Sequence, residues 1–559
     1  MSRARRGTTY GSGPNSEGIA AVESGESKPA PRGVLSSGSQ PNPRAAAFDQ
    51  GLAFEQTGDR DSAKLAYRKG MEIGSGEAAC NLGVLLQEDG AVDKAASVWR
   101  RGSELGNGEC SLNLGIVLEE AGDREAAKAA FRRALDLGEG RAGPPLGKLL
   151  TTEGDHEGAR EACSRGVELG DGGSAFLLGY LLHTSGQCAK AKVAYQKGAD
   201  LGDGDAAWGL WKVLMEEGQP EEARRALNRG AELGSAHACA SLGVLLDGSG
   251  DLEGAKAAYK RSVELGNGWS AGKLGYLQFL GGDEAEAEAS FRQGVGMGDA
   301  YSAYCFGWLL QQRGESNAAW AAFRKGADWG SPDAMAHLGL LYSGWGDREA
   351  AKTMFTRAME GGHGGSSCCL GLMLSSDGDG EGAIRAYRRG LELGDGASAA
   401  NLGMALNLRD DFSGAESALL RALDLGFVRA HCALGRFYER RKRYRQQAKQ
   451  HYVRAMEEGD AEAAFRLSRM LRREGDNDGS RNALDQAVQL ASGGFANWLA
   501  EKLRRAGDSK RAEELYLRAM RSGDASAAHK LAQMLTKRQG IDMRGWVPAV
   551  WVESGPQKH

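Results

Sequence analysis

Alanine recurs at a fixed interval of 32 residues over most of this chain. It stands at 12 successive positions in that register, from Ala63 to Ala415. Composition alone does not place one residue type so regularly, even in a chain with 83 glycines. A fixed period of this length is typical of repeat proteins, in which each unit packs against its neighbours. We therefore predict an array of one structural unit in place of several globular domains.

A register of glycine gives the phase of the unit. It runs from Gly58 to Gly378 at the same interval, is interrupted at Asp410 and Lys442, and resumes at Gly475 after a gain of one residue. From this register we expect about fifteen units and one further first helix.

The register also divides the chain into three parts. We expect a disordered N-terminal segment over residues 1–44, which are rich in Gly, Ser and Pro. The repeat array is expected over residues 45–537, and a C-terminal tail over residues 538–559.

The unit at residues 77–108 predicts a pair of helices. Apolar side chains such as Leu82 and Leu85 recur at spacings of three and four, which predicts an amphipathic helix over residues 77–89. The same pattern predicts a second helix over residues 92–105. With only a few residues between them, the two helices must be antiparallel.

Glycine, asparagine and proline mark the ends of these helices. Gly90 is placed for the tight turn inside the unit, and Gly106 for a left-handed C-cap at its end. Asn107 can then cap the next helix. Pro220 and Pro332 fall in first helical turns, where a missing N–H costs little.

Small and large residues alternate between the two helices. The first helix carries a glycine slot, such as Gly83, and the second carries an aromatic slot, such as Trp99. A ring that packs on bare backbone lets two helices approach closely. We expect the alanine register to serve the same close packing, so that larger side chains there would overpack the core.

Two repeat families share these features. Asn-Leu-Gly at residues 81–83, followed by Ala95, Trp99 and Gly102, resembles the tetratricopeptide repeat, whose unit is two residues longer. The Gly-Asp/Asn links between units resemble those of Sel1-like repeats. The resemblance implies an all-α, right-handed superhelical solenoid of antiparallel helix pairs. It also implies a protein-interaction scaffold that binds a peptide or partner protein along an inner groove made by the first helices.

The remaining motifs point away from catalysis and from membranes. Gly-Lys at residues 147–148 and 272–273 is followed by Leu, so neither is a phosphate-binding loop. The histidines are dispersed, and His363 with Cys368 and Cys369 is a poor zinc motif. We expect no enzyme activity, cofactor or metal. Nine scattered cysteines, no signal peptide and no long apolar run favour the cytoplasm.

The inner slots of the first helices give the candidate site. In the middle of the array these slots are aromatic, and near its end they are basic. We expect the partner to contact Phe176, Tyr180, Trp208, Tyr276, Tyr301, Tyr304, Trp308, Arg436, Arg440, Arg466, Arg469 and Arg473. Residues 436–474 hold 12 Lys/Arg and 6 Asp/Glu, a local charge of +6 in a chain of net charge −4. Aromatics would anchor the partner, and arginines would hold its acidic segment.

Three alternatives remain open from the sequence. The aromatics could pack between units while the arginines are only solvated. The basic C-terminal units could bind nucleic acid, although the equivalent slots of successive units hold no polar code for bases. Asn81, Asn113 and Arg141 occupy the slots of a clamp for a C-terminal carboxylate, as in some tetratricopeptide domains. The oligomeric state is not predicted.

Two places break the pattern of the array. Pro144 and Pro145 fall inside a first helix, which we expect to start late, near Pro144, and to leave residues 140–143 as a loop that is either a hinge or rigid. In the tail, Trp546 and Trp551 are expected to cap the last helix pair or to contact a partner.

Overall fold

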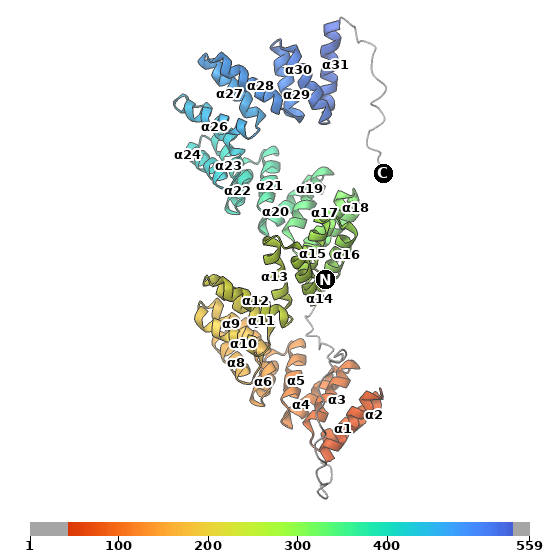
Figure 1. Cartoon of the computed structure of the whole chain (residues 1–559). Helices are drawn as coiled ribbons and strands as arrows, with labels where there is room; N and C mark the ends of the chain where they lie inside the picture. Colours follow the sequence, from red (N-terminus) through yellow and green to blue (C-terminus); the bar gives the residue numbers. More distant parts are fainter. Residues whose placement is uncertain (1–42, 540–559) are drawn as a thin grey trace, which may run out of the picture. The chain divides into compact units, whose positions relative to one another are not determined.

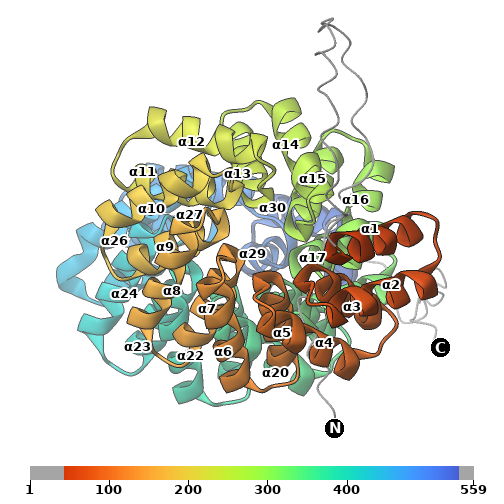
Figure 2. The same ribbon diagram turned by 90° about the horizontal axis from the view of Figure 1, so that it is seen from below.

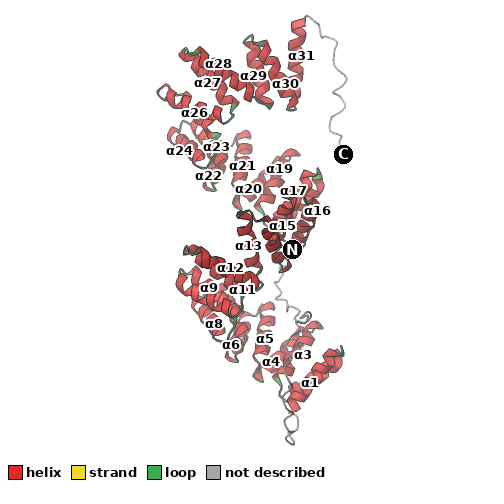
Figure 3. Cartoon of the chain, in the orientation of Figure 1, coloured by secondary structure: helices red, strands yellow, loops and turns green. Residues whose placement is uncertain are grey.

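The computed structural model describes residues 43–539 of the chain. This part folds into 31 α-helices and two short 3-10 turns, and it contains no β-strand (Figure 3). The predicted all-α solenoid of antiparallel helix pairs is confirmed. None of the helices in this part is long and apolar enough to cross a membrane. The N-terminal segment before residue 43 and the tail with Trp546 and Trp551 lie outside the described residues.

The helices group into two compact units, which divide after Leu169 (Figure 1). The first unit consists of four helix pairs with one 3-10 turn. Its elements are α1 (Pro43–Gln56), α2 (Arg60–Glu72), α3 (Gly76–Glu88), α4 (Val92–Glu104), α5 (Gly108–Glu120), α6 (Arg124–Asp136), η1 (Gly140–Ala142), α7 (Gly143–Thr152) and α8 (His156–Glu168).

The second unit continues the same alternation of first and second helices over more repeats (Figure 2). Its earlier elements are α9 (Gly172–Thr184), α10 (Cys188–Asp200), α11 (Gly204–Glu216), α12 (Pro220–Glu232), α13 (Ala236–Gly248), α14 (Leu252–Glu264), α15 (Gly268–Leu280), α16 (Glu284–Gly296), α17 (Ala300–Gln312), α18 (Ser316–Asp328), α19 (Pro332–Gly344) and α20 (Arg348–Glu360). Its later elements are α21 (Gly364–Ser376), α22 (Gly380–Glu392), α23 (Gly396–Leu408), α24 (Phe412–Asp424), α25 (Ala430–Glu439), η2 (Lys442–Tyr444), α26 (Arg445–Glu457), α27 (Ala461–Glu474), α28 (Asn477–Leu490), α29 (Gly493–Arg505), α30 (Ser509–Arg521) and α31 (Ala525–Gln539).

The links between helices are short and chemically alike. Gly90 and Gly106 have φ values of +77° and +88°, as their positions predict. The Asn107 side chain accepts a hydrogen bond of 2.8 Å from the N–H of Cys110, which caps α5. Asp410, in the glycine register, has a φ of 61° and is the one described residue other than glycine with a positive φ. The left-handed link is therefore kept at Asp410, although glycine is replaced there.

The core of each repeat is a ring on bare backbone. A Cβ atom added to Gly83 would lie 2.2 Å from Nε1 of Trp99, and one added to Gly307 would lie 2.7 Å from Cδ1 of Phe323. The Trp99 indole N–H donates to the carbonyl of Cys80 at 3.2 Å, so its polar atom is satisfied as well. The alanine register is buried at every position from Ala63 to Ala415. These contacts confirm the predicted pairing of small and large slots.

Two irregular repeats differ from the expectation in detail. Residues 140–142 form a 3-10 turn, and α7 begins at Gly143, so the helix starts late as predicted but no open loop precedes it. The 3-10 turn forms because proline removes backbone donors from the next turn. A hinge at this place stays a prediction. Near Lys442 the chain gains its extra residue, and α25 ends at Glu439 before η2.

Candidate partner-binding surface

First helices of successive repeats lie against one another in the second unit. α9 contacts α11, α15 contacts α17, and α25 contacts α27. Their side chains therefore form a surface that runs across repeats, as the resemblance implies. The site residues expected from the sequence lie on these helices. We call the seven aromatic positions on α9, α11, α15 and α17 the aromatic region. We call Arg436 on α25, Arg440 directly after α25, and Arg466, Arg469 and Arg473 on α27 the arginine region.

Most of the aromatic region is partly covered by neighbouring repeats. Tyr180 and Tyr276 are exposed, with 51% and 42% of their surface accessible, while the other five side chains are half-buried. The Phe176 ring lies 6.1 Å from that of Tyr195. The Trp308 ring meets Phe279 edge to face at 4.8 Å. The structure thus brings these rings into packing contacts and leaves two tyrosines open to a partner.

Trp208 is fixed between α11 and α13. Its indole N–H donates to the hydroxyl of Ser241 at 2.9 Å, and its ring centre lies 5.1 Å from that of His237. The Lys212 ammonium lies 5.0 Å from the ring centre, within the range of a cation–π contact. With its indole N–H hydrogen-bonded and its ring beside His237 of the next first helix, Trp208 contributes mainly to the contact between repeats.

His237 is held by a charged partner. Its Nδ1 lies 3.2 Å from Oδ1 of Asp205, which also accepts a hydrogen bond of 2.5 Å from the hydroxyl of Ser235. The hydrogen bond with Asp205 raises the pKa of His237 above its ordinary value. The same hydrogen bond lowers the pKa of Asp205. The positive form of His237 is therefore favoured beside the Trp208 ring.

A second aromatic cluster surrounds Tyr301. Its ring centre lies 6.2 Å from that of Trp269, and the Lys273 ammonium lies 5.0 to 5.2 Å from both rings. Tyr304 lies 5.3 Å from the ring of His337 on the next first helix. Trp269 was absent from the set predicted from the sequence. It precedes Tyr301 by one 32-residue period, so comparing equal slots would have found it.

The arginine region contains arginines that are already paired. Arg466 is bound through Nε to Glu462 at 2.8 Å and through Nη1 to Glu439 at 3.5 Å. Arg473 lies 3.8 Å from Glu439, and Arg436 lies 3.9 Å from Glu462. These pairs link α25 to α27, so Arg466 in particular has a structural role.

Arg440 and Arg469 differ from the other three. Both are exposed, and neither forms an ion pair with any residue that the structure describes. Arginine binds carboxylates through two parallel N–H donors, so free guanidinium groups of this kind suit an acidic ligand. They are the members of the arginine region with most capacity left for a partner.

A histidine pair beside the arginine region escaped the sequence analysis. Nδ1 of His431 lies 2.9 Å from Nδ1 of His451, and the His451 ring stacks on Tyr438. Burial lowers the pKa of both histidines, that of His451 to about 4. One neutral ring therefore donates to the other. The residues are 20 positions apart on different helices, which is why no local pattern signals them.

The slots of the carboxylate clamp in the first unit are occupied by internal contacts. The Asn81 amide donates to the Tyr67 hydroxyl at 3.1 Å, and the Asn113 amide lies 3.7 Å from Sγ of Cys80. Arg141 pairs with Glu139 at 2.7 Å. Arg141 also reaches Glu109 of α5 at 3.2 Å. The three side chains are thus used in contacts within the chain, which gives no support to a clamp.

The geometry defines a class of protein: an α-helical repeat solenoid, a class whose members are generally interaction scaffolds and not enzymes. Family models place the chain within this class. The model described as tetratricopeptide repeat matches residues 109–137, 236–265 and 332–360. Each matched segment coincides with one helix pair, namely α5–α6, α13–α14 and α19–α20, so the predicted tetratricopeptide-type repeat is confirmed at these places.

Solved structures of repeat proteins are similar to this chain. The protective antigen c5321 of uropathogenic Escherichia coli, which displays an SLR fold, is 19% identical, with 83% of this chain and 99% of that chain covered and a TM-score of 0.39. A Sel1 repeat protein from Oxalobacter formigenes is 23% identical, with 52% and 93% covered and a TM-score of 0.34. Human IFIT1, solved as a dimer with PPP-AAAA, is 18% identical, with 63% and 91% covered and a TM-score of 0.37. No curated protein matches the chain.

Proposed function

We propose that this chain is a scaffold that binds a peptide or partner protein along the first-helix surface of its second unit. In this proposal the arginine region holds an acidic segment of the partner, and the exposed edges of the aromatic region contact its apolar side chains. The observation that carries the proposal is the pair of exposed guanidinium groups at Arg440 and Arg469, free of internal ion pairs among the described residues. The proposal places the chain in the cytoplasm, where its nine free thiols would stay reduced.

Acidic peptides suit this surface better than nucleic acids do. Glu439 and Glu462 lie among the arginines and would repel a continuous phosphate backbone. The half-buried rings offer few free faces on which bases could stack. A peptide can place a few carboxylates opposite Arg440 and Arg469 and leave the glutamates uncontacted. The nucleic-acid alternative is nevertheless an outcome of the test.

Fluorescence anisotropy with three labelled probes tests the proposal. The probes are a peptide that contains glutamate and leucine, the same peptide with glutamine in place of glutamate, and a single-stranded RNA of equal length. We expect the acidic peptide to bind most tightly. The double variant Arg440→Glu/Arg469→Glu should weaken its binding at least about tenfold and flatten its dependence on salt.

A matched control separates this surface from net charge. Arg385→Glu/Arg388→Glu makes the same change in charge on α22, a second helix, where both arginines are exposed and without an ion pair among the described residues. Binding of the acidic peptide should survive in this control. Equal loss in both double variants, or tighter binding of RNA than of peptide, would contradict the proposed function.

A further inference from the structure

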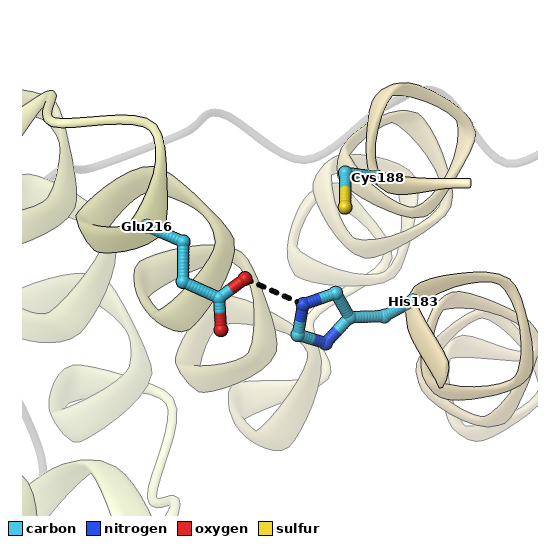
Figure 4. Close-up of side chains that lie close together, drawn as sticks. All are labelled: His183, Cys188 and Glu216. Atoms are coloured by element: carbon cyan, nitrogen blue, oxygen red, sulfur yellow. Dashed lines mark hydrogen bonds and ion pairs between the residues drawn. The ribbon is translucent and has the colours of Figure 1, made fainter. Parts of the chain in front are cut away.

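Three side chains of types that can bind a metal ion come together from three helices at one end of the second unit. His183 lies in the last turn of α9, Cys188 begins α10, and Glu216 ends α11. Their ligand atoms all lie within 4.8 Å of one another, and Nε2 of His183 lies 2.7 Å from Oε2 of Glu216 (Figure 4). In the close-up, the Cys188 thiol points toward the space beside the imidazole ring. The described part of the chain holds no second group of three such donors.

The repeat register shows what is unusual about this place. Four repeats earlier, the positions of Cys188 and Glu216 are held by Arg60 and Glu88, which form an ion pair of 2.6 Å. In that repeat, and again at Arg348 with Asp377, a guanidinium links the start of a second helix to the end of the next first helix. At Cys188 a thiol replaces the guanidinium, and His183 adds an imidazole beside it. The substitution turns an ion pair into a set of metal ligands.

We propose that His183, Cys188 and Glu216 bind a zinc ion that ties α9, α10 and α11 together. Thiolate, imidazole and carboxylate are all zinc ligands, and the thiolate disfavours Mg²⁺ and Ca²⁺, which take oxygen ligands. A thiolate and a carboxylate together carry two negative charges, which a divalent ion balances. The proposal is independent of the partner-binding surface.

The geometry allows the ion to enter with small movements. Ligand atoms on one zinc ion lie about 3.3–3.8 Å apart, given bonds of about 2.0–2.3 Å. The three ligand atoms are now up to 4.8 Å apart, and rotation of the exposed Glu216 side chain adjusts their distances. The ion would take the place of the hydrogen bond between His183 and Glu216. Water would complete a tetrahedron, as in zinc sites with three protein ligands.

Neighbouring charges leave Glu216 available for the ion. The adjacent carboxylate, Glu217, is bound by Lys192 at 2.8 Å, and the same ammonium reaches Gln219 at 2.9 Å. The Lys192 ammonium is thus already paired with Glu217 and does not compete for Glu216. The side chain of His183 is 20% exposed and that of Glu216 is 55% exposed, so zinc can reach the cluster from solvent without unfolding.

Titration of the full-length protein, produced without a histidine tag, tests the proposal. Zinc added against a chromophoric chelator should fill one site per chain, and Mg²⁺ should fill none. Cys188→Ser and His183→Ala should each weaken zinc binding by at least about tenfold. Cobalt(II) should produce a thiolate-to-metal charge-transfer band that disappears in Cys188→Ser. Acidification should weaken binding, because protons compete for the ligands.

The double variant Cys368→Ser/Cys369→Ser is the matched control, since these thiols are also partly exposed but lie outside the cluster. It should keep the site and the cobalt band. The proposal is overturned if the wild-type protein binds no zinc. It is equally overturned if Cys188→Ser binds zinc as tightly as the wild type, or if the control loses the site.

Discussion

The aromatic region and the arginine region both belong to the first-helix surface of the second unit, yet they use it differently. In the aromatic region most side chains contact neighbouring repeats, and only Tyr180 and Tyr276 are exposed. In the arginine region the shared side chain is Arg466, whereas Arg440 and Arg469 extend into solvent. The comparison teaches that a slot on the surface does not by itself determine whether a side chain stabilises the array or remains free for a partner.

The physical reason is that burial removes apolar surface of a ring from water, whereas it removes the hydration of a charged guanidinium group. Burial of an aromatic ring against the next repeat is favourable, so rings at adjacent slots pack together. A guanidinium is covered only where a carboxylate on the neighbouring helix compensates its charge. Glu439 and Glu462 provide that compensation for Arg466. Hence substitutions in the aromatic region should mainly change stability, and those at free arginines should mainly change binding.

The largest effect is expected at Trp208. Trp208→Ala removes a half-buried ring and its hydrogen bond to Ser241, and it should lower the free energy of unfolding by about 2–3 kcal/mol. Tyr180→Ala, at an exposed position, should change it by less than about 0.5 kcal/mol. Urea unfolding followed by circular dichroism measures both. Equal effects would remove the distinction between shared and free aromatic positions.

The next effect concerns the backbone under the aromatic cluster. A Cβ atom at Gly272 would lie 2.6 Å from the Tyr301 ring, so Gly272→Val should destabilise the protein by about 1–2 kcal/mol. Gly296→Ala is the control, because nothing lies within 4 Å of its Cβ position on α16. It should instead stabilise by about 0.5–1 kcal/mol. Thermal unfolding would contradict the packing argument if both variants shifted in the same direction.

A smaller effect is expected within the arginine region. Arg466→Ala breaks contacts with Glu439 and Glu462 and should destabilise by about 1 kcal/mol. Arg469→Ala should leave stability within about 0.5 kcal/mol of the wild type while weakening the acidic peptide. Unfolding and anisotropy measured on the same preparations separate the two roles. Loss of stability in Arg469→Ala would show that its guanidinium has a structural partner.

The smallest effects are expected at His237 and His451, whose contributions to stability should change in opposite directions as the pH rises. The pKa of His237 is raised by Asp205, so its stabilising contribution is complete below about pH 6.5 and is lost as pH rises through the folded-state pKa. Burial lowers the pKa of His451 to about 4, so its contribution is present above pH 6.5 and declines from there toward pH 4. Solvent screening keeps each near 1 kcal/mol. Unfolding of His237→Gln and His451→Gln across this range, compared with wild type, checks both signs.

The sequence predicted the elements better than it predicted the site. Gly90, Gly106 and Asn107 predict turns and caps that lie within a few residues of them, so the local sequence is enough to place the helices. The predicted first helix at residues 77–89 is found at Gly76–Glu88, one residue earlier at each end. The ring of Trp99 on Gly83 also follows from the repeat itself.

The rest depends on contacts between residues far apart in the chain. Arg466 meets Glu439 across 27 positions, and Glu216 meets His183 across 33 positions. Such pairs follow from the way one repeat is stacked on the next, which the period alone does not specify. The covered faces of Trp208 and Tyr301 have the same origin. Comparing each slot with its equivalent one repeat away, as for Trp269 and Tyr301, would recover part of this information.

The uniform links of the second unit have a consequence for the evolution of the number of repeats. From α9 to α24 every helix has 13 residues and every link has three. Ser235 caps α13 as Asn267 caps α15, each through its side chain and the N–H three residues on. Deleting residues 236–267 would therefore join Ser235 to Gly268 through a link with the same turn and the same cap. Unequal recombination between copies of the repeat can thus lengthen or shorten the gene in frame without creating a junction that the protein has not already folded.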